Sequence, residues 1–151
     1  SQTGRLPGID GNAKMSKSLG NTLTLSASEE AIHKAVSAMF TDPNHLRVSD
    51  PGRIEGNVVF TWLDAFHPDS AKVAAMKAHY QQGGLGDRTC KNELETCLQE
   101  LIAPMRERRN TFIQDKGALM AILREGSEKA RAVTHATLEE VKRGLGLPVL
   151  V

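Results

Sequence analysis

The residues that could do chemistry are concentrated in one short segment near the N-terminus of this 151-residue chain, Lys14-Met15-Ser16-Lys17-Ser18. This segment, the signature loop, places two ammonium groups three positions apart, with hydroxyl groups beside them. A glycine lies on either side of it, at Gly11 and Gly20. Lysine is a mobile point charge that suits phosphate oxygens, and glycines let a loop change conformation. The pattern predicts a loop that closes over a polyphosphate; the alternative is a solvated lysine pair with no ligand.

Signature loops of this sequence occur in the class I aminoacyl-tRNA synthetases, which the chain resembles. The longer run from Lys14 to Asn21 occurs in several members of that class, so the flanking segments must narrow the resemblance. They are similar to the C-terminal part of bacterial tryptophanyl-tRNA synthetases, with the related tyrosyl enzymes second: Leu6-Pro7-Gly8-Ile9-Asp10-Gly11, Ser28-Glu29-Glu30-Ala31-Ile32, Phe40-Thr41-Asp42-Pro43, Gly83-Gly84-Leu85-Gly86-Asp87 and Pro104-Met105-Arg106-Glu107-Arg108-Arg109. The resemblance runs from about Leu6 to Leu147.

The resemblance implies that the complete enzyme activates tryptophan with ATP and Mg²⁺ and then charges tRNA(Trp). Activation attacks the α-phosphate of ATP and expels pyrophosphate, so negative charge accumulates on the leaving phosphates. Ammonium groups placed there stabilise the transition state more than the ground state. By position in the motif, Lys14 and Lys17 are the expected catalytic residues. Ser16 and Ser18 are expected to add hydrogen bonds to ATP, and Met15 completes the ATP loop as a packing anchor.

The second signature of this enzyme class, a His-x-Gly-His-type element, is not found around any of the five histidines. No alternation of strands and helices predicts a doubly wound sheet either. We therefore expect the chain to be part of a longer enzyme and to be inactive alone, because tryptophan and ATP would bind through the missing half. Residues 1–25 would be the signature loop and a remnant of the nucleotide-binding catalytic domain, and residues 26–151 a helical tRNA/anticodon-binding domain. The complete enzyme is expected to be a homodimer, the isolated part a monomer.

A formal net charge of +1 excludes a globally basic nucleic-acid binder, but the charge is unevenly distributed. Between residues 101 and 131 there are seven lysines and arginines against four acids, a local charge of +3. A polyanion would meet this region first. The candidates for tRNA contacts are therefore basic residues of the C-terminal half: Arg106, Arg109, Arg124, Lys129 and Arg131. The alternative for each is a solvated side chain paired with a nearby glutamate.

The spacing of apolar residues predicts an all-α fold, a small helical bundle that follows the signature loop. Ser26-Ala27-Ser28-Glu29 forms a capping box that opens a helix ending near Phe40. Further helices are expected over residues 58–66, from Ser70 to the Gly83-Gly84 break, from an N-cap at Asp87 through Pro104 to Phe112, and over residues 118–143 with Gly144 at the end. Residues 23–25 alone are compatible with a strand.

The glycine-containing stretch over residues 6–21 is expected to be poorly ordered or held by accidental contacts, because its docking surface would belong to the missing half. No run of apolar residues reaches the ~20 that a membrane helix needs.

The two cysteines, Cys90 and Cys97, would lie roughly 10.5 Å apart along one helix, beyond the ~7 Å limit for a disulfide. Their spacing matches no zinc pattern, so no metal site is predicted. Two free thiols suit a cytoplasmic protein.

Two alternatives stay open. One is the corresponding part of a tyrosyl-tRNA synthetase, because the signature loop does not name the amino acid. The other is a non-catalytic helical RNA-binding module, although such a module has no use for an ATP loop.

Overall fold

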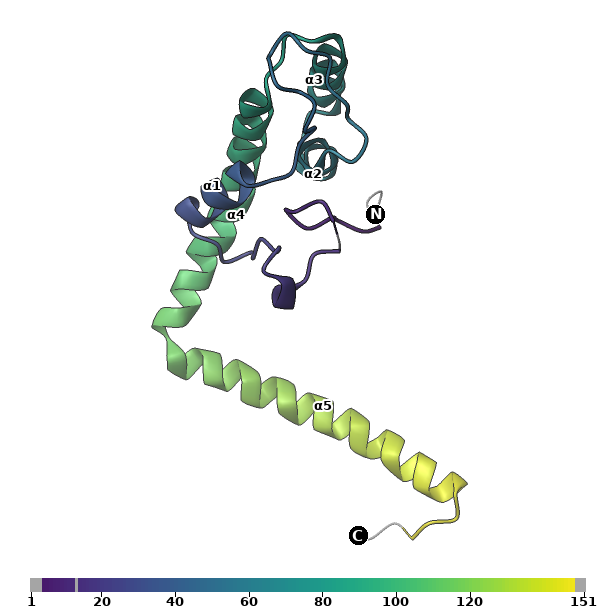
Figure 1. Cartoon of the computed structure of the whole chain (residues 1–151). Coiled ribbons are helices and arrows are strands. Elements are labelled where there is room, and N and C mark those ends of the chain that lie inside the picture. The colour runs from purple at the N-terminus through teal and green to yellow at the C-terminus, as the bar shows by residue number, and fades with distance from the viewer. Residues whose placement is uncertain (1–3, 13, 149–151) are drawn as a thin grey trace. The chain divides into compact units, whose positions relative to one another are not determined.

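A computed structural model describes residues 4–12 and 14–148 of the chain, and that part contains five α-helices (Figure 1). They are α1 (Glu29–Ser37), α2 (Val58–Phe66), α3 (Ser70–Gln82), α4 (Asp87–Gln114) and α5 (Lys116–Gly144). A short 3-10 helix, η1 (Lys17–Leu19), lies within the signature loop. The described residues form no strand, only an isolated bridge between Pro7 and Lys14. The all-α prediction is confirmed, and the strand considered for residues 23–25 does not form.

The chain divides into two compact units, Ser1–Glu107 and Arg108–Val151. The first contains the signature loop, α1 to α3 and most of α4; the second contains the end of α4 and α5. The predicted boundary after residue 25 separates a catalytic remnant from a tRNA-binding domain by function, and it stays a prediction. By packing, the signature loop belongs to the same compact unit as the helices that follow it.

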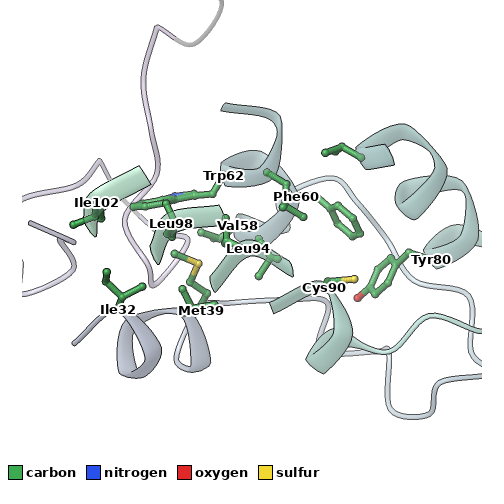
Figure 2. Close-up of a cluster of buried hydrophobic side chains, with 14 of the residues drawn as sticks. Ile32, Met39, Val58, Phe60, Trp62, Tyr80, Cys90, Leu94, Leu98 and Ile102 are labelled. Carbon is green, nitrogen blue, oxygen red and sulfur yellow. The ribbon is translucent and has the colours of Figure 1, made fainter. Parts of the chain in front are cut away.

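One face of α4 organises the core of the first unit (Figure 2). Its buried residues recur every three or four positions, the period of a single helical face: Cys90, Leu94, Cys97, Leu98 and Ile102. Ile32 of α1, Leu63 of α2 and Tyr80 of α3 are all fully buried in the same cluster. Three helices from earlier in the chain therefore share one hydrophobic surface on α4.

The helix starts follow local capping chemistry, with two corrections to the predictions. The cap of α1 is Ser28, whose hydroxyl accepts a hydrogen bond from the Ala31 amide, and not Ser26. Asp87 is the first residue of α4 and not its cap. Its carboxylate accepts a hydrogen bond of 2.7 Å from the buried Tyr80 hydroxyl. This side chain therefore joins α3 to α4.

The start of α2 and the end of α5 can also be compared with the predictions. The predicted limits of α2 are confirmed, and Asn57 caps it by accepting from the Val59 amide. The predicted end of α5 at Gly144 is confirmed, and the left-handed glycine that follows it is Gly146, with φ of 69°.

Tyr80 also fixes the loop between α1 and α2. The Gly52 amide donates to the Tyr80 carbonyl at 2.9 Å, and a Cβ added at Gly52 would lie 2.1 Å from the Tyr80 ring. Only glycine fits this approach. The long loop is thereby held against α3 at a position where no side chain can intervene.

The second unit shows a different pattern. No residue of α5 is buried, and nothing lies within 4 Å of the position where a Cβ would extend from Gly126. Phe112, near the end of α4, is 53% exposed.

The two cysteines are free thiols buried on α4, as predicted. Burial raises the pKa of the Cys90 thiol to about 12 and also raises the pKa of Cys97. Both thiols are therefore protonated and unreactive at neutral pH.

Among the described residues, no helix combines the length and apolar character needed to cross a membrane.

The core arrangement predicts a large cost for shortening Leu94, which is fully buried between α4 and its neighbours. Leu94→Ala should lower the free energy of unfolding by about 2–5 kcal/mol, because it removes buried methyl groups and leaves a cavity. Urea unfolding followed by circular dichroism measures the change. Leu46→Ala is the control, since Leu46 is 84% exposed. Equal effects of the two substitutions would contradict this core.

Candidate functional site

The signature loop is a tight, hydrogen-bonded turn. The Leu19 amide donates to the Ser16 carbonyl and the Gly20 amide to the Lys17 carbonyl, both at 3.2 Å. Gly20 has φ of 67°, a left-handed conformation that favours glycine and ends η1. The two hydroxyl groups, of Ser16 and Ser18, lie 2.9 Å apart. The backbone of the loop is therefore compact.

Both lysines of the loop are exposed, and neither ammonium group pairs with another described side chain. Unpaired exposed ammonium groups keep their full charge for an external anion. Ser16 is half-buried and Ser18 exposed, so both hydroxyl groups can reach a ligand beside the lysines. The structure therefore brings Lys14, Lys17 and the two serines together on one loop.

The segment that leads into the loop is anchored to the helical core. The Trp62 indole of α2 donates to the Pro7 carbonyl at 3.2 Å, and the Phe40 amide donates to the Ile9 carbonyl at 3.0 Å. Leu6, Ile9 and Met15 pack against the core cluster. Part of the docking surface of this stretch therefore lies within the chain itself, and its poor order stays a prediction.

Met15 is the apolar member of the loop and contacts the helical core, which agrees with a packing anchor. It lines an apolar cavity of about 170 Å³ together with Trp62 and Leu98. The Met15 side chain therefore has apolar neighbours from α2 and α4.

One further basic residue lies near the loop. Arg5, Asn12 and Lys14 line the same open depression, of about 260 Å³. Sequence analysis missed Arg5, because it lies nine positions before Lys14 and only the chain reversal at Gly11 brings them together. Gly11 has φ of 72°, which is the local signal for such a reversal.

The predicted tRNA residues fall into two groups. Arg106 is engaged within the first unit: its guanidinium donates to the Ala27 carbonyl at 2.8 Å and pairs with Glu29 at 3.1 Å. Lys129 pairs with Glu125 on α5 at 2.6 Å. By contrast, Arg109, Arg124 and Arg131 are exposed and have no ion pair within the described part of the chain. Arg106 and Lys129 therefore both show the pairing with a glutamate that is the alternative to a tRNA contact, and the tRNA role of all five residues stays a prediction.

Two other polar side chains hold the loops around α1. Lys91 of α4 donates to the Ser37 carbonyl at the end of α1, at 2.8 Å, and burial lowers its pKa. The Asp42 carboxylate accepts from the amides of Asn44 and Arg53 at 2.9 and 2.8 Å. These backbone hydrogen bonds hold the pKa of Asp42 below its usual value. Both side chains thus hold backbone groups at the end of α1 or in the loop that follows it.

Comparison with known proteins shows the family to which the chain belongs. The family model "tRNA synthetases class I (W and Y)" matches residues 2–103. The chain belongs to this family. Within it, the tryptophan–tRNA ligase of Streptococcus pyogenes serotype M3 (strain ATCC BAA-595 / MGAS315) is 52% identical over 148 residues, which cover 97% of this chain and 44% of that protein. The Clostridium longisporum ligase is 51% identical over 95% of this chain and 42% of its own length.

Solved structures of class I synthetases agree with the sequence relatives. The tryptophanyl-tRNA synthetase from Campylobacter jejuni, complexed with ADP and tryptophan, matches with a TM-score of 0.79 and 27% identity. The match covers 97% of this chain and 45% of that one. The enzyme from Giardia lamblia matches with a TM-score of 0.63 and 27% identity, over 70% of this chain and 27% of its own. The chain thus spans less than half the length of its synthetase relatives.

The contacts of Arg106 predict a structural effect. Arg106→Ala removes a donor from the carbonyl of Ala27, which is 7% exposed. The substitution should lower the free energy of unfolding by about 1–3 kcal/mol, the cost of leaving a buried polar group unpaired. Arg109→Ala, in the next turn of the same helix, should change it by less than ~0.5 kcal/mol. Urea unfolding of both variants checks the difference; a neutral Arg106→Ala would make this side chain available for RNA.

Proposed function

We propose that this chain is the part of a longer tryptophan–tRNA ligase that contains the signature loop and the helical region. Three observations support the proposal: the match to the W and Y family, 52% identity to tryptophan–tRNA ligases, and the composition of the loop. The single observation that carries the chemistry is the pair of exposed, unpaired ammonium groups of Lys14 and Lys17 on an anchored loop.

In the proposed reaction, the carboxylate oxygen of tryptophan attacks the α-phosphorus of ATP. A mixed anhydride forms, the bond to the bridging oxygen breaks, and pyrophosphate leaves with the added negative charge. Lys14 and Lys17 stabilise that charge as it develops. Ser16 and Ser18 donate hydrogen bonds to phosphate oxygens, while Met15 keeps the loop in contact with the helical core. The second step transfers the tryptophanyl group to the terminal ribose of tRNA(Trp).

Mg²⁺ would enter with ATP and would not be held by this loop. Asp10 is the single acid between residues 4 and 21, and the Asn21 amide already engages its carboxylate. Magnesium is commonly held by phosphate oxygens with few protein ligands. The loop therefore supplies cationic side chains, and the phosphates supply the ligands for the ion.

For tRNA we propose contacts from the exposed arginines of the second unit, Arg109, Arg124 and Arg131, with Lys129 beside them. Arg124 and Arg131 are seven positions apart on α5, which places them on one face of the helix. Such a pair can contact successive phosphates or a base edge. We further propose that the complete enzyme is a cytoplasmic homodimer, as the resemblance to this family implies.

The tyrosyl alternative has less support, because the relatives at about half identity are tryptophan–tRNA ligases. The non-catalytic RNA-binding module is also disfavoured, since the family match includes the signature loop. Amino-acid-dependent exchange of pyrophosphate into ATP separates them. Tryptophan should support exchange by the complete enzyme and tyrosine should not, and exchange with neither amino acid would favour the module.

The first functional prediction concerns Lys17. In the complete enzyme, Lys17→Ala should lower the rate of tryptophanyl-adenylate formation about 10²–10³-fold, the usual cost of removing one transition-state donor. Lys14→Ala should cost less. The tryptophan dissociation constant should change little, because the lysine faces the phosphates. Single-turnover kinetics measure the rate, and Lys34→Ala on α1 is the control. An unchanged rate for Lys17→Ala removes this residue from the mechanism.

The 151-residue chain by itself should give pyrophosphate exchange equal to the no-enzyme blank. It holds the loop but, within the described residues, no sheet that could bind adenosine and tryptophan. Labelled pyrophosphate and ATP with saturating tryptophan test this directly. Clear exchange above the blank would mean that these residues suffice for activation.

The tRNA prediction uses the two exposed arginines of α5. Replacing Arg124 and Arg131 together by alanine should weaken tRNA(Trp) binding in the complete enzyme. A base-edge contact would cost about 1–3 kcal/mol and reduce discrimination between anticodons, whereas phosphate contacts would weaken all RNAs alike and reduce the salt dependence. Filter binding at several salt concentrations distinguishes the two. Unchanged affinity would place the RNA elsewhere.

A further inference from the structure

Asn21 follows the signature loop directly and is a buried amide side chain. It is 3% exposed, and all the hydrogen-bonding groups of its side chain have partners within the same segment. Its Oδ1 atom accepts from the Ser16 amide at 2.8 Å. Its Nδ2 atom donates to both oxygens of the Asp10 carboxylate, at 3.2 and 3.3 Å. The side chain therefore bridges the segment before the signature loop to the loop itself.

The two sides of this bridge differ in how they are fixed. The side that contains Asp10 belongs to the helical core, because Trp62 holds Pro7 and the Phe40 amide holds Ile9. The Asn21 carbonyl also accepts from the Ile9 amide at 3.1 Å. The side that contains Ser16 carries the two lysines and is exposed. Asn21 thus connects the charged side to the anchored side.

The packing around Asn21 leaves room for no other arrangement. A Cβ added at Gly8 would lie 2.2 Å from the Asn21 Nδ2 atom and 2.8 Å from the Asp10 Oδ1 atom. Glycine at position 8 is therefore required for the amide to reach the carboxylate. A group this enclosed, with each donor and acceptor matched, holds a defined geometry.

We propose that Asn21 is a positioning residue for tryptophan activation: with Asp10 it sets the place of the Ser16 backbone, and through it the places of Lys14 and Lys17. The proposal rests on the function proposed for those lysines. Asn21 makes no contact with substrate in this account. Its effect is to fix the loop before ATP arrives, so that less ordering remains for the reaction step.

An exchange of the two side-chain types tests this geometry. Asn21→Asp keeps the acceptor for the Ser16 amide but sets a second carboxylate against Asp10, and the like charges should separate the two sides. In the double variant, which adds Asp10→Asn, an amide at position 10 can donate to a carboxylate at position 21. The pair then again has one donor and one carboxylate. In the complete enzyme, Asn21→Asp should lower kcat for pyrophosphate exchange about 10–10²-fold, the scale for a reacting group displaced by about 1 Å. The double variant should return to within about threefold of the parent enzyme.

Three controls keep the result specific. Asn92→Asp makes the same chemical change on the exposed surface of α4 and should leave kcat unchanged. The KM for tryptophan and the thermal midpoint of Asn21→Asp should stay near those of the parent, which a purely structural defect would shift. A double variant as slow as Asn21→Asp, or an Asn21→Asp enzyme at the parent rate, would overturn the proposal.

Amide exchange in the 151-residue chain tests the bridge without relying on activity. Asn21→Ala should speed exchange of the Ser16 amide at least tenfold, because that amide loses its acceptor. Unchanged Ser16 exchange would contradict the bridge itself. If Lys17→Ala leaves activation intact while Ser16 exchange responds as expected, the function proposed for the lysines fails and the structural bridge stands. The two failures are thus distinguishable.

Discussion

The burial of one face of α4 is the constraint on which the first compact unit depends. A single helix supplies Cys90, Leu94, Leu98 and Ile102 at helical spacing, and α1, α2 and α3 cover that face. None of these shorter helices, of 9 to 13 residues, would be stable by itself in water. Their stability comes from packing against α4, so the loops between them are fixed by the same contacts.

The signature loop is held by this core indirectly, through the chain segment that precedes it. Trp62 is buried in the cluster, and its indole nitrogen reaches the backbone just before the loop. The two lysines are therefore exposed on a loop whose base is fixed by the helical core. The helical region thus carries the base of the signature loop, whatever else it contacts.

Local sequence signals predicted the helices well and the long-range contacts poorly. The limits of α2 followed from an apolar run after Asn57, and α3 followed from Asp69 and the Gly83-Gly84 break. The cap of α1 was misplaced because two serines lie within three residues of each other. The engagement of Arg106 could not be read from the sequence, because its partner Ala27 lies 79 positions away. The same holds for the Trp62–Pro7 contact, which anchors the stretch expected to be poorly ordered.

The absence of buried side chains on α5 has a consequence for how the chain unfolds. With 29 residues, α5 exceeds the ~12–15 residues below which isolated helices are marginal. Its helicity rests on its own backbone, on the Asp115 cap and on the Glu125–Lys129 and His135–Glu139 pairs. Helices supported in this way lose structure gradually from their ends as temperature rises. Because a shared core favours cooperative melting of the first unit, we expect the 151-residue chain to depart from a single two-state transition.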